Sequence, residues 1–179
     1  MERTERQMAI LAGGCFWCLE AVFEQVPGVL GVVSGYIGGA LENPDYESVC
    51  GGQTGHAEAV RIEFDPERVS FGQLLEIFFS IHDPTTLNRQ GNDVGTQYRS
   101  AIFCHDEGQR IEAETMIAAL DAQPIWPAPI VTEVLPATVF YPAEAYHQHY
   151  YAQHPEQGYC QFIIAPKLEK FRKLFSGRL

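Results

Sequence analysis

The order in which apolar segments of two periodicities follow one another constrains the fold of this chain more than any other feature. Short β-rich runs predict strands, and longer runs with apolar residues three and four apart predict helices. The predicted strands are residues 8–14, 29–39, 56–65 and 99–105, with one bent strand or two short ones in 129–141. The predicted helices are residues 15–26, 70–82, 106–120 and 142–154.

The resulting order, β-α-β-β-α-β-α-β, contains the β-α-β-β-α-β unit of a ferredoxin-like α+β fold. We therefore predict a two-layer sandwich core in a single domain over residues 1–179. Two connections, 38–55 and 83–98, are long for a compact domain, and such loops are usually functional or disordered. Their aromatic and polar residues argue against disorder. The C-terminal segment 155–165 is predicted to be an irregular tail that contains a cysteine.

Charge and hydropathy exclude several kinds of partner. The formal net charge of −11 argues against a nucleic-acid backbone or an anionic membrane surface. No apolar run approaches the ~20 residues needed to span a bilayer, and the apolar stretch near the N-terminus is too short for a signal peptide. We therefore expect a cytoplasmic protein. Its five cysteines are an odd number, so catalytic, metal-binding or buried thiols are expected rather than paired disulfides.

Cys15 directly follows Gly13 and Gly14 at the predicted junction of the first strand and the first helix. The free N–H groups and the dipole at a helix start stabilise a thiolate and lower the pKa of a cysteine there. The alternative is a buried, inert cysteine. We favour a reactive thiol, because a glycine pair before a helix presents nucleophiles in other folds.

Cys15 and Cys18 form a C-x-x-C pair, which allows two further hypotheses. A structural zinc site is disfavoured, because it needs a second cysteine pair or a nearby histidine pair, and the sequence offers neither beside these cysteines. A thioredoxin-like dithiol is the stronger alternative, because residues i and i+3 of one helix are close enough for a disulfide. The large Phe16 and Trp17 between the cysteines fit the walls of an apolar pocket better than a redox loop.

Glu58 lies early in a predicted strand whose other residues are largely apolar, two positions after His56. If Glu58 points inward beside the thiol, desolvation raises its pKa and makes it a proton donor near neutral pH. The alternative is an exposed strand glutamate. We expect His56 to be a structural residue that forms hydrogen bonds.

Five stretches of the sequence together resemble the peptide methionine sulfoxide reductase A family. In chain order they are GGCFWCLE, GYIGG, NPDYESVCGGQTGHAEAV, GNDVGTQYRS and YPAEAYHQHY, and they cover most of the chain from 12 to 160. The resemblance implies a ferredoxin-like core and an oxidoreductase that reduces the S epimer of methionine sulfoxide, free or in proteins. From the residues alone, the alternatives are a general thiol–disulfide oxidoreductase that uses Cys15 and Cys18, and a non-catalytic zinc- or peptide-binding module.

The resemblance also implies roles for individual residues. Cys15 would be the nucleophile and Glu58 the acid, while Phe16 and Trp17 would hold the methyl group of the substrate. The tyrosines of two further motifs would hydrogen-bond the sulfoxide oxygen, and an aspartate belongs to the same site. These three residues are Tyr46, Tyr98 and Asp93.

After methionine leaves, Cys15 would be a sulfenic acid, which a second cysteine converts to a disulfide that thioredoxin or a similar dithiol reduces. Relatives often have two tail cysteines, whereas this chain has only Cys160 there and has Cys18 in addition. We favour Cys160 as the resolving cysteine over Cys18, and a relay through both stays open. Cys50 is expected to be structural and Cys104 buried. We expect no cofactor and no metal, and we expect a monomer.

Overall fold

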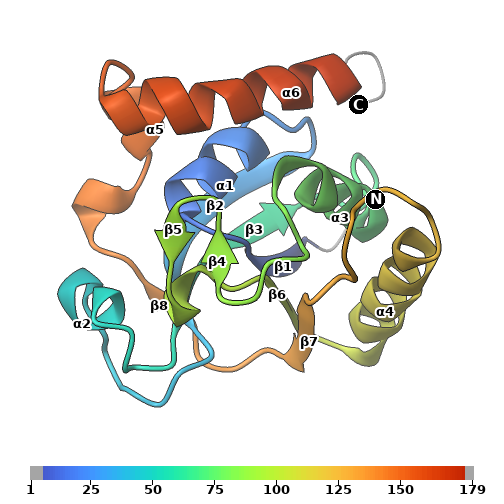
Figure 1. The fold of residues 1–179 in the computed structure, drawn as a ribbon, viewed down its shortest axis with the longest axis horizontal. Helices are drawn as coiled ribbons and strands as arrows, with labels where there is room; N and C mark the ends of the chain where they lie inside the picture. Colours follow the sequence, from blue (N-terminus) through green and yellow to red (C-terminus); the bar gives the residue numbers. More distant parts are fainter. Residues whose placement is uncertain (1–5, 176–179) are drawn as a thin grey trace, which may run out of the picture.

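The computed structural model describes residues 6–175, and a six-stranded sheet forms its centre (Figure 1). The strands are β1 (Gln7–Ala12), β2 (Val29–Ile37), β3 (Ala57–Phe64), β6 (Ala101–Cys104), β7 (Glu133–Pro136) and β8 (Tyr141–Pro142). Their order across the sheet is β7-β6-β1-β3-β2-β8. Neighbouring strands are antiparallel, except for the parallel pair of β6 and β7. All the predicted strands are therefore present. Residues 129–141 form two short strands rather than one bent strand, because they contain β7 and the first residue of β8.

The register of β3 determines which side chains meet at the middle of the sheet. β3 pairs with β1 on one side and with β2 on the other, and its residues 57–60 are all buried. Tyr36 of β2 lies directly opposite Glu58 of β3. Because directly opposed residues of antiparallel strands share one face, these two side chains lie on the same side of the sheet.

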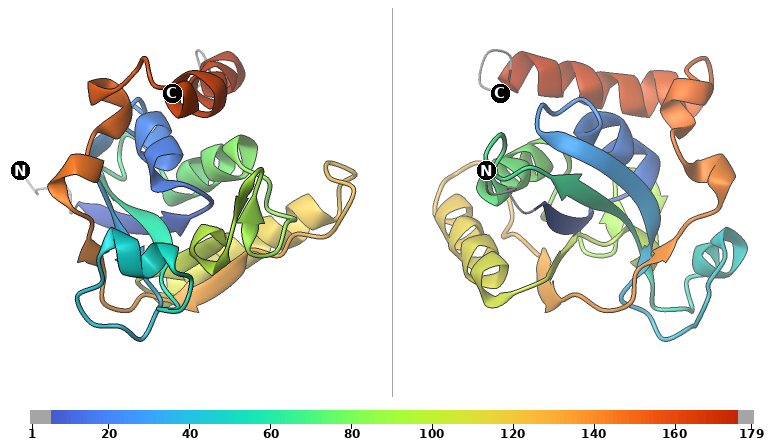
Figure 2. Two further views of the ribbon diagram at one scale, coloured as in Figure 1. Left: turned by 60° about the vertical axis from the view of Figure 1, so that its left-hand side comes forward. Right: turned by 180° about the vertical axis from the view of Figure 1, so that it is seen from behind.

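Four longer helices pack around this sheet: α1 (Phe16–Phe23), α3 (Phe71–Ile81), α4 (Glu107–Asp121) and α6 (Ala165–Phe175). α1 contacts β2 and β3, while α3 contacts α4 (Figure 2). α6 packs against both α1 and α3, at the top of the view in Figure 1. Ser70 caps α3 as predicted, in a capping box with Gln73.

The two long connections contain short ordered elements. The first contains α2 (Tyr46–Cys50), which begins with a capping box between Asp45 and Ser48. The second contains the hairpin of β4 (Arg89–Gln90) and β5 (Asp93–Val94), followed by a 3₁₀ turn at Thr96–Tyr98. Both connections therefore hold predicted site residues on defined backbone.

The prediction of one helix over residues 142–154 is wrong. The segment forms a 3₁₀ turn at Ala145–His147 and the four-residue helix α5 (Tyr150–Gln153). His149 separates the two with a left-handed φ of 55°, a conformation that a continuous right-handed helix cannot contain.

The prediction of an irregular C-terminal tail over residues 155–165 is also wrong from Cys160 onward. A turn of π-helix, Cys160–Ile164, leads directly into α6. The physical reason is burial, because Cys160 and Ile164 lie in the same core as Leu168, Phe171 and Phe175 of α6 and extend its apolar stripe. In the part of the chain that the structure describes, no helix is long and apolar enough to cross a membrane.

We expect Phe171→Ala to lower the free energy of unfolding by about 3–5 kcal/mol, the usual range for truncating a core phenylalanine. Phe171 is 5% exposed and joins α6 to the core. The matched control is Phe162→Ala, because Phe162 is 77% exposed. Urea unfolding measures both, and equal effects of the two substitutions would contradict the packing of α6 described above.

Candidate active site

The turn between β1 and α1 places Cys15 at the N-cap of α1, as the sequence predicts. Gly14 has a φ of +93°, which an L side chain rarely adopts, so this tight turn needs glycine. A Cβ on Gly13 would lie only 2.9 Å from the ring of Phe78, so the preceding residue must be glycine as well. The turn leaves Cys15 9% exposed, at the edge of the core.

Cys15 and Cys18 form one hydrogen-bonded pair of thiols. Burial, then the hydrogen bond to Cys18 and the negative charge of Glu58, raise the pKa of Cys15 well above its usual value. The hydrogen bond from Cys15 lowers the pKa of Cys18 to about 7, against burial and with help from the charge of Lys167. The expected low pKa of Cys15 is therefore wrong for the resting pair, because the helical N–H of Trp17 lowers it less than burial raises it.

Glu58 points inward, which is the first of the two alternatives that the sequence leaves open. It is 1% exposed, and its Oε1 accepts a hydrogen bond from the backbone N–H of Phe16 at 3.2 Å. Burial raises the pKa of Glu58 to about 8, and the charges of Asp93 and Cys18 add to the shift. Its Oε2 is buried and has no hydrogen-bond partner among the described residues. At neutral pH this carboxyl is mostly protonated and has a free oxygen within the core.

An aromatic cluster follows Cys15 along α1. Phe16 is fully buried against Tyr36 and His147, with ring centroids 5.7 and 5.1 Å away. Trp17 is half-buried and stacks on Tyr150 at 3.7 Å. Its Nε1–H donates to Nδ1 of His147 at 3.1 Å. Both predicted aromatic residues are thus held rigidly beside the thiols.

The two predicted tyrosines approach Glu58 from different loops. The backbone N–H of Tyr46 and the hydroxyl of Tyr36 both donate to the carboxylate of Glu144, at 2.9 and 2.8 Å. This anchors the start of α2. Burial raises the pKa of Tyr98, and the charge of Glu58 adds to it. Burial and then the hydrogen bond with Cys50 raise the pKa of Tyr46, so both phenols stay protonated and can donate a hydrogen bond.

Asp93 and the C-terminal segment meet over the thiols through Tyr159. The hydroxyl of Tyr159 donates to Oδ2 of Asp93 at 2.8 Å and lies 3.7 Å from Sγ of Cys18.

A cavity of about 530 Å³ opens at Cys15, a size that suits a small ligand. Its other lining residues are Gln90, Gly91, Asn92, Asp93, Tyr159, Phe162, Ile163, Pro166 and Lys167. Phe16 and Trp17 are not among them.

The remaining cysteines and His56 have different environments. Cys160 is completely buried in the π-helical turn, and Cys50 is exposed. Cys104 is buried in β6, as predicted. His56 accepts a hydrogen bond from the N–H of Gly39 at 3.0 Å and contacts a backbone carbonyl through Nε2, which confirms its structural role.

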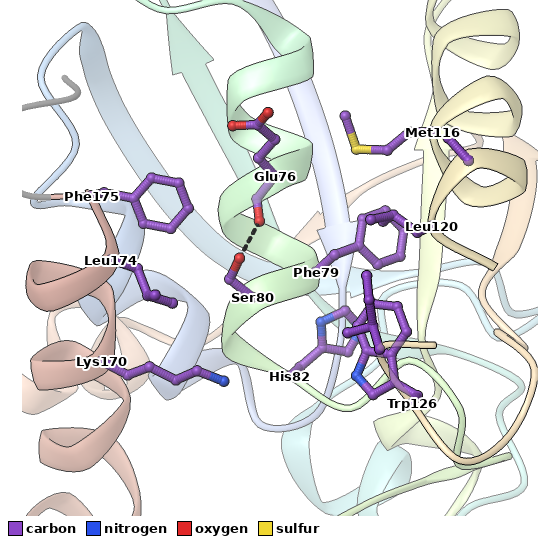
Figure 3. A pocket seen from close by; sticks show the side chains of 12 residues that line it. Glu76, Phe79, Ser80, His82, Met116, Leu120, Trp126, Lys170, Leu174 and Phe175 are labelled. Carbon is purple, nitrogen blue, oxygen red and sulfur yellow. Dashed lines mark hydrogen bonds between the residues drawn. The ribbon is translucent and has the colours of Figure 1, made fainter. Parts of the chain in front are cut away.

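A second cavity, of about 430 Å³, lies between α3, α4 and α6 (Figure 3). Figure 3 shows Phe79, Leu120 and Trp126 on one side of it and Lys170 and Leu174 on the other. It contains no predicted site residue and no thiol, so we do not assign the chemistry to it.

One group of side chains in residues 6–175 lies close enough together to share a cation. The ligand atoms of Glu20, Glu24 and His149 are all within 4.8 Å of one another. Burial and the neighbouring Glu24 raise the pKa of Glu20 to about 7. No cysteine belongs to this group, so it gives no support to the zinc hypothesis.

The sequence does not predict three residues of the site: His147, Tyr159 and Lys167. His147 lies in the motif YPAEAYHQHY, so the resemblance covers it without giving it a role. Tyr159 is signalled only by its position next to Cys160. Lys167 belongs to a basic run in the sequence, and only the packing of α6 brings it to the cavity at Cys15.

A buried thiol pair beside a protonated carboxyl, on a mixed α/β fold, defines a thiol-dependent oxidoreductase. The family model for peptide methionine sulfoxide reductase matches residues 7–178. Peptide methionine sulfoxide reductase MsrA from Chromobacterium violaceum is 59% identical over 173 residues, which cover 97% of this chain and 98% of that protein. The chain belongs to the peptide methionine sulfoxide reductase family.

Solved structures agree with this assignment. Mxr1 from Saccharomyces cerevisiae in reduced form has a TM-score of 0.81 and 34% identity, covering 89% of this chain and 91% of that one. Mxr1 in complex with Trx2 shares the fold, with a TM-score of 0.57 and 24% identity over 83% of this chain and 87% of that one.

We expect Glu58→Gln to stabilise the protein increasingly as the pH rises from about 5 to 8. Glu58 keeps its proton up to a pKa of about 8 in the folded state, but loses it near 4.5 when unfolded. The free energy of unfolding of the wild type therefore falls between pH 5 and 8 by a few kcal/mol relative to that of Glu58→Gln. Above pH 8, the difference between the two proteins stays constant. Urea unfolding at several pH values measures this. The control Glu42→Gln, at an exposed position, should show no such trend.

Proposed function

We propose that the protein reduces the S epimer of methionine sulfoxide, free or in proteins, with Cys15 as the nucleophile. The observation that carries the proposal is the free Oε2 of Glu58, a buried and mostly protonated carboxyl beside the thiol. A sulfoxide sulfur is a poor electrophile until its oxygen gains a proton. A protonated carboxyl at this position supplies that proton as a general acid.

Tyr46 and Tyr98 assist Glu58 by donating hydrogen bonds to the sulfoxide oxygen. Their raised pKa values, caused first by burial, keep both phenols protonated. Preorganised donors aimed at a developing charge need no rearrangement in the transition state. Asp93 orients the site through its hydrogen bond with Tyr159.

Phe16 and Trp17 hold the methyl group of the substrate. The hydrogen bond from Trp17 to His147 and its stacking on Tyr150 support this, because they fix the indole in one orientation. A fixed aromatic wall on one side and oxygen donors on the other make the site chiral. It should therefore accept one sulfoxide epimer.

Reduction of the sulfoxide converts Cys15 to a sulfenic acid and releases methionine. A second thiol, from Cys18 or Cys160, then forms a disulfide with Cys15 and water is lost. Thioredoxin or a similar dithiol reduces the disulfide. The structure of the similar protein Mxr1 in complex with Trx2 supports this choice of reductant.

The finer description of the fold as ferredoxin-like belongs to the same proposal. The antiparallel order β6-β1-β3-β2, with α1 after β1 and α3 after β3, supports it. The match of the family model to residues 7–178 supports a single domain. The cytoplasmic location and the monomeric state stay predictions of the sequence.

We expect the reduced protein to release about one equivalent of methionine from methionine-S-sulfoxide without added reductant, and to lose two thiols. Methionine-R-sulfoxide should remain unchanged. Chromatography and thiol titration measure the two products. Cys15→Ser should release no methionine. If the wild type forms a disulfide but releases no methionine, the general thiol–disulfide oxidoreductase is the correct hypothesis.

We expect Glu58→Gln to slow methionine release in the first turnover by roughly 10²- to 10⁴-fold, the range for loss of a general acid. The thiol of Cys15 remains, so the variant should still react with a small alkylating reagent. Rapid-quench measurement of released methionine gives the rate. An unchanged rate would show that the proton comes from another group.

A further inference from the structure

We propose that Lys167 is a positioning residue for the resolving step: it holds Cys18, rather than Cys160, as the thiolate that attacks oxidised Cys15. This inference rests on the proposed function, because it concerns the disulfide that follows sulfoxide reduction. It assigns a role to a residue of α6 that the sequence leaves in a basic surface run.

Cys18 is already in place for the reaction with Cys15. The N–H of Cys18 donates to the carbonyl of Cys15 at 3.1 Å within the first turn of α1, and each thiol shifts the pKa of the other. A disulfide between them needs only side-chain rotation and a small backbone adjustment. The pair therefore requires no displacement of any other element.

Cys160 is in a poorer position for the same step. It is completely buried in the π-helical turn, where burial raises the pKa of its thiol. The helix that follows it is fixed to the core by Leu168 and Phe171. Presenting Cys160 to Cys15 would require this segment to move first, whereas Cys18 can react within the resting fold.

Lys167 is the positively charged side chain at this site. It lines the cavity at Cys15 together with Tyr159, whose hydroxyl lies 3.7 Å from Sγ of Cys18. Among residues 6–175, no carboxylate forms an ion pair with Lys167. Its charge acts on Cys18, and it also acts on His82, which lines a neighbouring cavity with Lys167, Asp83 and Lys170.

The titratable groups that act on or near Cys18 come from several elements. They are Cys15 on α1, Lys167 on α6, Tyr159 and Cys160 at the π-helical turn, Asp93 on β5 and Glu58 on β3. Asp93 opposes a thiolate at Cys18, while Lys167 and the Tyr159 hydroxyl favour it. Lys167 is the one cation in this set.

The role of Lys167 becomes critical once Cys15 is oxidised. In the resting pair, the hydrogen bond from Cys15 is the largest cause of the low pKa of Cys18. A sulfenic acid no longer offers that S–H, and the one proton of the Tyr159 hydroxyl is donated to Asp93, so the charge of Lys167 is what remains to stabilise the thiolate. Cys18 then attacks Sγ of Cys15, an S–S bond forms, the S–O bond breaks, and the hydroxide leaves as water after gaining a proton.

The test uses the full chain, one equivalent of methionine-S-sulfoxide and no reductant, with samples quenched over time between pH 6 and 9. Each sample gives the released methionine, the sulfenic acid trapped by dimedone, and the disulfide identified by peptide mapping. The variants are Lys167→Met, Lys167→Arg and Lys173→Met. Lys173 is exposed on the same helix, so its substitution is a matched control for the loss of one positive charge.

In the wild type, the first disulfide should join Cys15 to Cys18. For each equivalent of methionine released, Lys167→Met should keep the sulfenic acid longer, and it should shift the pH midpoint of disulfide formation upward. At pH 7, a rise of one unit in the pKa of Cys18 slows this step by roughly five- to tenfold, because the thiolate fraction falls by that factor. Lys167→Arg should restore the wild-type profile, and Lys173→Met should not change it.

Two results would overturn the proposal. One is a first disulfide between Cys15 and Cys160 in the wild type. The other is a pH profile of Lys167→Met that matches that of Lys173→Met. Methionine release separates this failure from a failure of the proposed function: normal release with the wrong disulfide contradicts only the role of Cys18 and Lys167, whereas no release contradicts the sulfoxide reductase itself.

Discussion

The hydrogen bond from the N–H of Phe16 to Oε1 of Glu58 joins the first turn of α1 to the central strand β3. It uses one of the N–H groups that a helix start leaves free, and it occupies one oxygen of the carboxyl. The other oxygen has no hydrogen-bond partner within residues 6–175. This single contact therefore sets the position of the acid relative to the nucleophile. The glycine turn at Gly14 and the register of Tyr36 against Glu58 both serve to make it possible.

The site concentrates acidic groups in a volume that cannot hold all of their charges at once. The charges of Glu58 and Cys18 raise the pKa of Cys15, and the charges of Asp93 and Cys18 raise the pKa of Glu58. The protein resolves this competition by geometry. Glu58 keeps its proton because it is buried with one weak partner, and the negative charge of the thiol pair falls on Cys18, on the side of Lys167.

This distribution of charge has a chemical consequence. A protonated Glu58 can donate to a sulfoxide oxygen, which an ionised carboxylate cannot do. The same proton would be lost if a strong cation lay against Glu58, and the described structure instead places Lys167 where its charge lowers the pKa of Cys18. An acid and a thiolate can thus coexist in one site near neutral pH, each stabilised by a different neighbour.

Much of this arrangement could be predicted from local sequence patterns. Period-two and period-3.6 runs indicate β1, β3, α1 and α3, and the glycine pair before Cys15 indicates a strand–helix turn. The apolar strand neighbours of Glu58 leave two alternatives, an inward acid and an exposed glutamate, and the resemblance to the reductase family selects the first. These features depend on residues that are close together in the chain, so periodicity and turn chemistry are sufficient to find them.

Features that depend on long-range packing could not be predicted in this way. The pKa order of Cys15 and Cys18 depends on burial and on Lys167, which lies about 150 residues later in the sequence. The helix start alone therefore suggests the wrong sign for Cys15. His147 also could not be predicted from local patterns, because it contributes to the site through its hydrogen bond with Trp17, 130 residues away.

The packing of α6 connects these long-range features to the question of which thiol resolves the sulfenic acid. Burial of an aromatic or aliphatic side chain contributes about 1.5–3 kcal/mol, and α6 buries three such side chains. Releasing the segment to expose Cys160 would forfeit part of this free energy, together with the hydrogen bond between Tyr159 and Asp93. Attack by Cys18 forfeits neither. The packing of α6 and of the turn before it, which fixes Lys167 and Tyr159 near the thiols, therefore favours Cys18 for the first disulfide, and the same packing keeps Cys160 buried.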